Sequence, residues 1–484
     1  MSIGVEITTS LRSGPSNPGR GSGRFHIPAV TEKGPTATTP VVRSLAQYES
    51  IFGGRTAYSS TAYDSVRLFF EEGGSEVAVT RVVGPNAAVG SLTLNDRAAA
   101  PLPTLRIDAV DPGAHSSATT IEVANNGSNF DIIVRNGTDV VQRFTNLTSP
   151  ADAVDAAYRS PFVRIVNLGS ATAAPANNPA VRAATPLVAG SDDRAAITAT
   201  TVIEALDAAG DVAPGGIVAA PGYTADVIGE DLLAHARRTN KVAALSMDAD
   251  ATVAEVKAAA AVLSTGPDAA YGGLFYPHLV VPDGSRSRTV SPEGYVAAVR
   301  ARAHLAVGFW QVPAGERALT RWATDTTSPF DEIVNNDLAL GLVNGIAVTS
   351  GRIRLYGWSS LSSDRDDLGL LSARDVLNNL AVGIKARLAP HVFSTIDGRG
   401  HMLAFVRSDV VGYLDPIASA GGFYARIVDD VPIDPGYSVT VDESINTVES
   451  LARNEVNVSV AVRLSPTAQL IKAEIIKVAL EATV

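Results

Sequence analysis

The chain has 484 residues, which is too long for one compact core and predicts about two to four domains. Hydrophobic residues make up 46% of it and charged residues 18%, which excludes a disordered or collagen-like chain. Soluble domains typically carry about 25% charged residues, so the low value suggests that further protein, most simply other copies of the chain, covers part of the surface. The net charge of -11 argues against direct nucleic-acid binding, which needs clustered Lys and Arg.

Several classes of protein are excluded by what the sequence lacks. It contains no cysteine, so disulfides, thiolate metal sites and cysteine nucleophiles are excluded. No run of 18 apolar residues is present, and the N-terminus lacks the basic and apolar segments of a signal peptide. We therefore expect neither membrane insertion nor signal-directed export.

The first 24 residues predict an N-terminal strand arm on a flexible linker. The apolar residues Ile3, Val5 and Ile7 alternate with polar ones, which is the period of a strand with one apolar face. The stretch from Arg12 to Arg24 is rich in Gly, Pro, Ser and Arg, which favours a flexible linker. The globular part is predicted to begin at Phe25.

Residues 25–86 are predicted to form the first part of the core. Apolar residues at helical spacing predict a helix over 62–70, and Gly73 and Gly74 mark its end. A strand is expected directly afterwards, over 76–83.

The segment 87–190 is predicted to be an inserted β-rich outer domain. It contains short alternating runs, separated by Asn-Gly and Asp-Pro-Gly turns, at 105–109, 120–124 and 131–135. A small independent core is expected between the two ends of this segment.

Residues 191–330 read as an α/β region, because helical signals alternate with short apolar runs. Capping patterns Thr201–Glu204 and Thr252–Glu255 predict helix starts, and Ser291-Pro292 predicts another. The expected strands lie at 216–220, 241–246 and 274–281.

A C-terminal region, 331–464, and a final arm, 465–484, complete the predicted division. Ser372–Asp375 resembles a capping box that would open a helix with one apolar face, Leu377, Leu380, Ile384 and Leu388. The clearest predicted strand spans 456–464 and is ended by Ser465-Pro466. Its alternating apolar residues are Val456, Val458, Val460, Val462 and Leu464. The last predicted strand is apolar on both faces and contains Ile471, Ile475, Ile476, Val478 and Leu480.

No recognised catalytic or metal motif is present in the sequence. No lysine follows a glycine, which excludes a phosphate loop, and the dinucleotide fingerprint, the Gly-x-Ser-x-Gly elbow and His-Glu-x-x-His are absent. The stretch from Asp248 begins like a calcium loop, but Val253 and Ala259 stand where Gly and Glu are required. For His391 and His401, and for the acidic loop that contains Asp364, Asp366 and Asp367, a solvated surface is favoured over a metal site.

An ordered series of residues spans about fifty positions near the N-terminus. The series consists of Gly34-Pro35, Pro40-Val41-Val42, Ser44, Tyr48, Phe52-Gly53-Gly54, Val66, Phe69-Phe70, Gly73-Gly74 and Val79-Thr80-Arg81-Val82. It resembles the N-terminal signature of contractile phage tail sheath proteins. Later landmarks of that family are resembled by Ala189–Asp193, Tyr276-Pro277, Val290-Ser291-Pro292 with Gly294, Val312-Pro313-Ala314 and Val343-Asn344-Gly345-Ile346. The sequence departs from the family at Asp193 and Gly345, where Gly and Pro are usual, and at His278, where an aromatic residue is common.

The resemblance covers the framework from about residue 25 to the end, without the segment 87–190. It implies a mixed multidomain fold of α+β and α/β character, with a tail-sheath-like core, strand-donating N- and C-terminal arms and the inserted β-rich domain. The donated strands would be the two arm strands, and Val456, Val458, Val460 and Val462 would belong to an acceptor strand.

The resemblance further implies a structural subunit, without catalysis or cofactor, of a helical sheath that contracts and drives an inner tube through the host cell envelope for genome ejection. The implied partners are further copies of the chain in stacked hexameric rings, the inner tail tube, the baseplate and the tail terminator, with no direct nucleic-acid contact. The implied location is the virion tail, assembled in the host cytoplasm.

Two alternatives stay open at this stage. The chain could be the sheath of a phage-derived bacteriocin or another contractile injection particle, whose subunit chemistry would be the same. In a different class, it could be an α/β enzyme without a recognised motif, for which a stable monomer and a deep polar pocket are expected.

Overall fold

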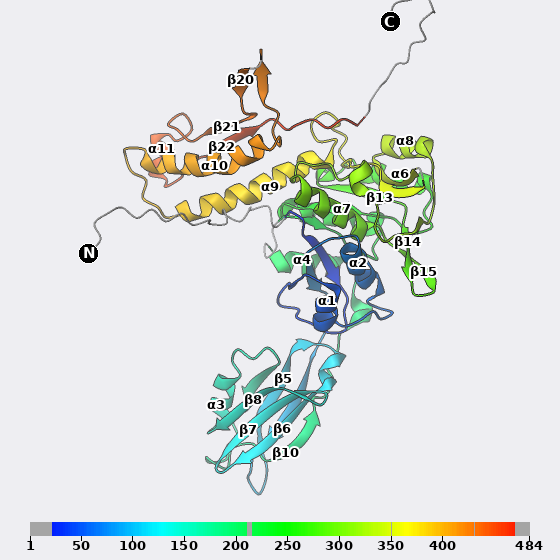
Figure 1. The fold of residues 1–484 in the computed structure, drawn as a ribbon. Coiled ribbons are helices and arrows are strands. Elements are labelled where there is room, and N and C mark those ends of the chain that lie inside the picture. The colour runs from blue at the N-terminus through cyan, green and yellow to red at the C-terminus, as the bar shows by residue number, and fades with distance from the viewer. Residues whose placement is uncertain (1–21, 211–214, 350, 430, 470–484) are drawn as a thin grey trace, which may run out of the picture.

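The computed structural model describes residues 22–210, 215–349, 351–429 and 431–469. Figure 1 shows three parts: a central α/β body, an inserted β-rich unit that projects from one side of it, and a C-terminal unit with two long helices on the other side. Both predicted arm strands lie outside the described residues.

The central body is built on an eight-stranded sheet with the order β18-β17-β13-β12-β11-β1-β3-β2. Its inner six strands are parallel, whereas the edge strands β2 and β18 are antiparallel to their neighbours. The strands are β1 Phe25–Ala29, β2 Val41–Val42, β3 Val77–Arg81, β11 Ile217–Val218, β12 Val242–Leu245, β13 Gly272–Tyr276, β17 Val343–Thr349 and β18 Arg352–Leu355.

Helices cover both faces of this sheet, which explains why its inner strands are apolar on both sides. Alternate residues of a strand therefore enter different cores: Ile217 packs into the core under α2 and α7, and Val218 into the core under α4 and α5. The helices of the body are α1 Leu45–Phe52, α2 Ser60–Glu71, α4 Ala199–Ala209, α5 Ala225–Arg238, α6 Val253–Leu263, α7 Glu293–Ala306 and α8 Glu332–Leu340.

The predicted helix over 62–70 and the strand after it are confirmed as α2 and β3, and the predicted capping box at Thr252 and Glu255 is confirmed at α6. Two other predicted starts are wrong. Helix α4 begins one turn earlier than predicted, because the side chain of Thr198 accepts from the backbone of Thr201 and occupies the cap. Ser372 does not cap a helix, because Asp375 is buried and binds Arg300 instead of the first turn.

The predicted single strand over 274–281 is two strands in different sheets. Strand β13 ends at Tyr276 in the central sheet, and β14 starts at Leu279 in a separate three-stranded sheet with the order β15-β14-β16. The strands of the small sheet are β14 Leu279–Asp283, β15 Arg286–Val290 and β16 Asp325–Thr326. A continuous apolar run cannot show such a change of sheet, because both halves are buried, and Phe275 of β13 lies in the same core as Leu279 and Val281 of β14.

The inserted unit contains two antiparallel sheets and one short helix, α3 Pro150–Ala156. Its buried side chains, which run from Leu92 to Leu187, form a hydrophobic core of their own. One sheet has the order β4-β5-β9 and the other β10-β6-β7-β8. The strands are β4 Val89–Asn95, β5 Pro103–Pro112, β6 Thr119–Asn126, β7 Asn129–Asn136, β8 Asp139–Leu147, β9 Val163–Asn167 and β10 Arg182–Pro186.

The C-terminal unit packs two antiparallel helices against a small sheet (Figure 1). Its elements are α9 Leu371–Leu388, α10 His401–Ser419, α11 Val448–Ala452, and the two strand pairs β19 Arg426–Val428 with β20 Val431–Asp434 and β21 Tyr437–Thr440 with β22 Ser459–Val462. Of the predicted apolar face of α9, Leu380, Ile384 and Leu388 pack into this core. Val376, and not the predicted Leu377, is the residue of the preceding turn that packs there.

Three residues predicted as flexible linker are packed against the body. Ser22 is buried and its carbonyl accepts a hydrogen bond from Arg300, Gly23 lies against Ala301, and Arg24 forms an ion pair with Glu76. The linker prediction therefore does not hold for Ser22–Arg24, because tertiary contacts compensate for the flexibility of Gly and Ser.

Candidate assembly surfaces

The residues of the N-terminal signature build one edge of the central sheet. Ser44 caps α1 by accepting from the backbone of Gln47, and Tyr48 and Phe52 of that helix are buried. Gly34 has a positive φ of 111°, and a Cβ there would lie 2.6 Å from the Phe52 ring. These residues fix the fold rather than present reactive groups.

The later landmarks also have structural roles. Gly294 lies where helix α7 meets α2, and a Cβ there would lie 2.3 Å from the Ser65 carbonyl oxygen. Asn344 is fully buried; its Oδ1 accepts from the Ser359 backbone at 2.6 Å, and its Nδ2 donates to the Ser359 carbonyl at 2.9 Å. Asp193, where the family usually has Gly, adopts the left-handed φ of 48° that favours glycine.

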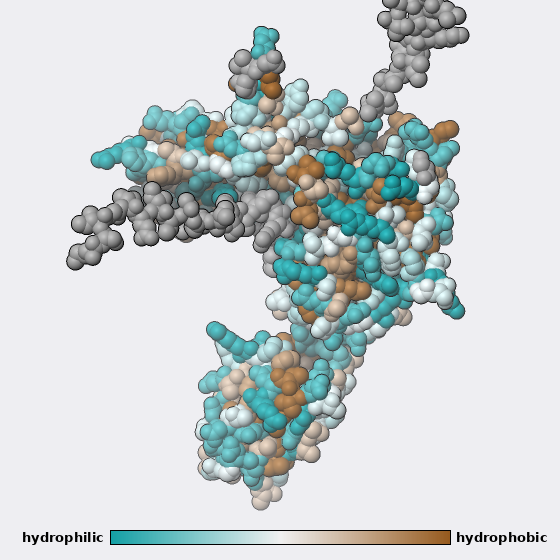
Figure 2. Space-filling model, in the orientation of Figure 1, coloured by the Kyte–Doolittle hydropathy of each residue, from teal (hydrophilic) through white to brown (hydrophobic). Residues whose placement is uncertain are grey.

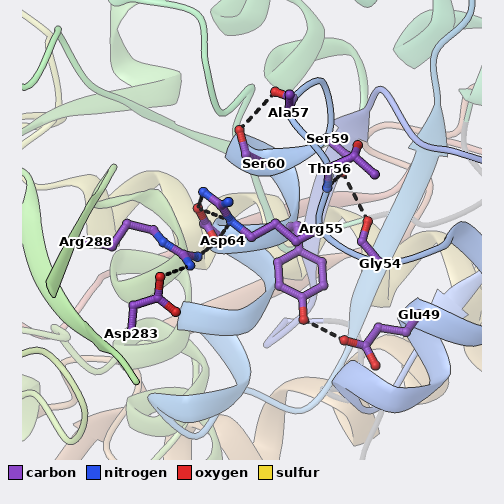
Figure 3. Close-up of polar contacts among 11 residues, drawn as sticks. Glu49, Gly54, Arg55, Thr56, Ala57, Ser59, Ser60, Asp64, Asp283 and Arg288 are labelled. Carbon is purple, nitrogen blue, oxygen red and sulfur yellow. Dashed lines mark hydrogen bonds and ion pairs between the residues drawn. The ribbon is translucent and has the colours of Figure 1, made fainter. Parts of the chain in front are cut away.

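Figure 3 shows an ion-pair cluster that joins helix α2 to the β14–β15 hairpin. Asp64 accepts from Arg55 Nε at 2.9 Å and also from Arg288, and Arg288 in turn donates to Asp283. A polar cleft of about 420 Å³ lies beside it, lined by hydroxyl side chains and by His278, whose Nε2 contacts the Met247 carbonyl at 2.8 Å. Arg55 and Asp64 also line this cleft, but their charges are paired within the cluster, which joins the hairpin to α2.

No cluster of three potential metal-ligating side chains occurs among the described residues. His391 is paired with Asp409 at 2.7 Å, and Asp397 accepts from the backbone N–H groups of residues that start α10. The hydrogen bonds from these N–H groups, above all that of Met402, lower the pKa of Asp397. In the described part of the chain, no helix is both long and apolar enough to cross a bilayer.

The C-terminal unit contains an apolar groove of about 930 Å³ at one end of its sheet. Leu388 of α9, Met402 and Val406 of α10, and Val456 and Val458 line it. Phe393 stands at its border, fully exposed, with a positive φ of 68° that is unusual for a bulky residue. The groove therefore offers apolar area that this part of the chain does not cover.

The predicted strand over 456–464 is shorter in the structure, since β22 covers only Ser459–Val462. The side chain of Asn446 takes the place of a strand neighbour at Asn457: its Oδ1 accepts from the Asn457 N–H at 2.6 Å and its Nδ2 donates to the Asn457 carbonyl at 3.0 Å. The predicted apolar face exists, because the alternating residues pack against the α9–α10 core while remaining half-buried: Val456, Val458, Val460, Val462 and Leu464.

Within the described residues, β22 is paired in a sheet with β21 alone. The hairpin β19–β20 projects from the same unit in Figure 1, and Figure 2 shows a hydrophobic group on it. Ile427, Val428 and Ile433 of this hairpin are exposed. Two-stranded sheets with exposed apolar side chains are only marginally stable in water by themselves.

Of the predicted site residues, the structure places Val456, Val458, Val460 and Val462, which were predicted to belong to an acceptor strand, together on one face. The N-arm residues Ile3, Val5 and Ile7 lie outside the described residues, as do the C-arm residues Ile471, Ile475, Ile476, Val478 and Leu480. Sequence reasoning missed the groove, because its lining comes from four separate segments that only the tertiary structure brings together.

Solved structures with a similar fold cover nearly the whole chain. A sheath tail protein from Listeria innocua matches with a TM-score of 0.60 at 15% identity, covering 92% of this chain and 95% of its own. The sheath of an extracellular contractile injection system, PVC, in the contracted state matches with a TM-score of 0.58 at 13% identity, covering 98% and 97%. A chain of the anti-feeding prophage baseplate matches with a TM-score of 0.57 at 12% identity, covering 99% and 98%.

The chain has the fold of a contractile sheath subunit. The resemblance seen in the sequence is confirmed at the level of the fold, including its mixed α/β multidomain character. No known family's sequence profile matches the chain, and no curated protein matches it in sequence. The likeness to sheath proteins therefore lies in the architecture, at identities where few side chains are shared.

Proposed function

We propose that this chain is the structural subunit of a contractile sheath, which polymerises helically around an inner tube and contracts to drive the tube through a cell envelope. The observation that carries the proposal is the match in fold to a contracted sheath over 98% of this chain and 97% of the other. The proposed role is structural rather than catalytic, in keeping with the mutual neutralisation of Arg55, Asp64, Asp283 and Arg288.

We propose that the strand β22 and the residues before it accept strands from neighbouring subunits. Val456 and Val458 line the open groove, and β22 has one strand neighbour among the described residues. Strand addition would satisfy backbone groups on the other edge and cover the half-buried valines at the same time. This combination of a free edge and apolar area favours an incoming strand over an incoming helix.

The proposed donors are the two arms of other copies of the chain. Ile3, Val5 and Ile7 would supply one apolar face, and the segment 471–480 would supply a strand that is apolar on both faces. A linker of ten residues, from Arg12 to the packed root at Ser22, could span about 35 Å when fully extended, enough to reach another subunit.

We also propose the corresponding division of the chain into domains. An arm and linker that end before the packed residues 22–24 would precede a core that extends to residue 86, the outer insertion at 87–190, an α/β part at 191–330, a C-terminal domain at 331–464 and a second arm at 465–484. The separate hydrophobic cores of the inserted unit and of the C-terminal unit support this division.

The proposed partners are further copies of the chain in stacked hexameric rings, the inner tube, the baseplate and the terminator of the tail. The sheath would be assembled in the host cytoplasm and belong to a phage virion tail that ejects a genome. A bacteriocin or another contractile injection particle would use the same subunit chemistry. Genome neighbours that encode a capsid would favour the virion.

Negative-stain electron microscopy of the purified protein at high concentration, with and without the tube protein, tests the proposal. Wild-type protein should form tubular polymers of regular width. The Val458→Lys variant should remain a folded monomer, whereas Val448→Lys, at an exposed position of the same unit, should polymerise normally. A wild-type protein that stays monomeric beside the tube would overturn the sheath role, and equal polymerisation of both variants would overturn the acceptor strand.

A further inference from the structure

A buried cluster lies where the N-terminal arm joins the body. Arg300 of helix α7 donates from Nε to Asp375 Oδ2 at 2.9 Å and from Nη2 to Asp375 Oδ1 at 2.5 Å. Its remaining Nη1 group donates to the backbone carbonyl of Ser22. Both charged side chains are almost completely buried, with 1% of Arg300 and 2% of Asp375 exposed. One guanidinium therefore holds the root of the arm and a helix of the C-terminal part at the same time.

Further contacts fix the arm root in place. The carbonyl of Arg24 accepts from the Ile217 N–H at 2.9 Å, and the Arg24 side chain pairs with Glu76 at 3.1 Å. A Cβ at Gly23 would lie 3.4 Å from the Ala301 Cβ, so the backbone passes close to helix α7 one residue beyond Arg300. The described chain thus begins packed against the body, with Ser22 buried and Gly23 and Arg24 half-buried.

Helix α9, which carries Asp375, connects the body to the C-terminal unit. Its first half is bound to the body, because Asn378 Nδ2 donates to the Lys241 carbonyl at 2.9 Å and Leu371 belongs to the central core. Its second half belongs to the other core, through Leu380 and the partly buried Ile384. That second core also holds the half-buried valines of the proposed acceptor strand.

Because the Arg300–Asp375 pair is buried, loss of either partner is expected to be strongly destabilising. Removing one partner of a buried ion pair leaves an uncompensated charge in a medium of low dielectric, which is among the most costly single changes in a protein. His304 lies 3.8 Å from Asp375, and its own pKa is lowered well below the usual value, chiefly by burial and then by the charge of Arg300. A neutral His304 leaves Arg300 as the cation that balances Asp375.

We propose that the Arg300–Asp375 pair links the root of the N-terminal arm to helix α9, so that tension on the arm reaches the C-terminal unit of the same subunit during contraction. This inference rests on the proposed sheath function. In a sheath, the subunit would hold a neighbour's arm in its C-terminal unit and send its own arm to another neighbour. The pair would then connect the C-terminal unit, which holds a neighbour's arm, to the root of the subunit's own N-terminal arm through one buried contact.

Hydrogen exchange of the full-length protein, measured by mass spectrometry, tests the link itself without any sheath. In Arg300→Met, peptides covering 23–29 and 371–380 should exchange faster, on the order of tenfold or more, because loss of the pair frees both segments. The matched control is Arg81→Met, which removes an equally buried Arg–Asp pair at the base of the inserted unit. The control should speed exchange near 84–90 and 188–193 but not at 23–29.

A second variant keeps the test decisive if Arg300→Met does not fold. The double variant Arg300→Met with Asp375→Leu replaces the pair by apolar side chains, an exchange that proteins often tolerate. It should fold, yet still show faster exchange at 23–29, since the Ser22 carbonyl has lost its donor. Exchange at 23–29 that is equal in wild type, double variant and Arg81→Met would overturn the link.

Contraction of assembled sheaths tests the transmission of tension. The double variant should form extended sheaths on the tube, but a contraction trigger should leave most of them extended or only locally contracted. Contraction as complete as in wild type would overturn the transmission. If wild-type protein forms no sheath at all, the proposed function fails, whereas the exchange experiment still decides whether Arg300 joins the arm root to α9.

Discussion

The inserted unit and the C-terminal unit are both small β-containing parts attached to the same body, but among the described residues only the inserted unit covers its own apolar surface. In the inserted unit, two sheets of three and four strands enclose side chains such as Ile121, Phe130 and Ile132, which are fully buried. In the described part of the C-terminal unit, the strand pairs are two-stranded, and the valines before and within β22 are half-buried.

The difference lies in how each unit deals with its sheet edges and its apolar faces. Two facing sheets bury their inner residues on one another, so the inserted unit needs no further partner for its core. A two-stranded sheet laid on two helices leaves an edge and the groove beside Val458 uncovered. An incomplete surface of this kind is what strand donation between subunits would use.

The largest effect is expected from removal of the C-terminal arm. A chain that ends after Pro466 should remain soluble and folded, because the described cores contain no residue beyond it, yet it should form no polymer. Circular dichroism, size-exclusion chromatography and electron microscopy would measure fold and assembly. Normal polymerisation would show that this arm is not donated, and an insoluble, unfolded product would show that the strand completes its own subunit.

Matched truncations in the two units should differ in their effect on stability. Ile132→Ala removes a fully buried side chain of the inserted core and should cost about 2–5 kcal/mol of unfolding free energy. Val458→Ala removes a half-buried side chain and should cost the isolated subunit about 1 kcal/mol or less, with a larger loss of assembly. Denaturant titration of both variants is the measurement; equal costs would contradict the difference between the units.

The central body should be sensitive to acid through its buried histidines. Burial, followed by the charge of Lys241, holds the pKa of His26 well below its usual value, so the unfolded chain binds the proton more readily than the folded chain. The stability due to neutral His26 is complete above about pH 6.5 and is lost as the pH falls below it, at up to about 1.4 kcal/mol per pH unit.

The variant His26→Gln tests this dependence. Glutamine can keep a hydrogen bond to Thr80, which His26 Nε2 contacts at 2.9 Å. Between pH 6.5 and 5.5, unfolding free energies of the wild type should fall by about 1 kcal/mol more than those of the variant. Parallel pH curves for the two proteins would show that His26 does not titrate between the folded and unfolded states.

The smallest effect is expected when the self-contained unit is removed. Replacing residues 89–188 by a Gly-Ser linker should leave polymerisation intact and shift the midpoint of thermal unfolding of the body only slightly. This replacement leaves Asp192 in place. Asp192 accepts a hydrogen bond from the buried Arg81 at 2.7 Å, at the base of the inserted unit. Loss of all polymers in a variant whose body still folds would show that this unit takes part in assembly.

The sequence by itself determined the elements whose signals are local. The alternation in 105–109, 120–124 and 131–135 identified strands of the inserted unit, because successive side chains of a strand point to opposite faces, although Ile132, Ile133 and Val134 of β7 are all buried. The Thr252–Glu255 pattern identified the start of α6, because the capping hydrogen bonds lie within one turn. The resemblance to sheath proteins could also be recognised in the sequence. Part of it rests on glycines such as Gly34 and Gly294, at positions where the fold leaves no room for a Cβ atom.

Only the tertiary structure decided the features that depend on distant partners. Asp375 resembled a capping residue and instead binds Arg300, which is 75 positions away, because a buried carboxylate needs a cation more than a solvated helix end needs a cap. The run 274–281 is divided between two sheets. At Asn457, the backbone N–H group donates to the Asn446 side chain instead of to a neighbouring strand, so β22 is shorter than predicted. Periodicity indicates which side chains are buried, but not which neighbours they pack against. The apolar groove and the contact of the Arg300–Asp375 pair with Ser22 could therefore be identified only in the folded chain.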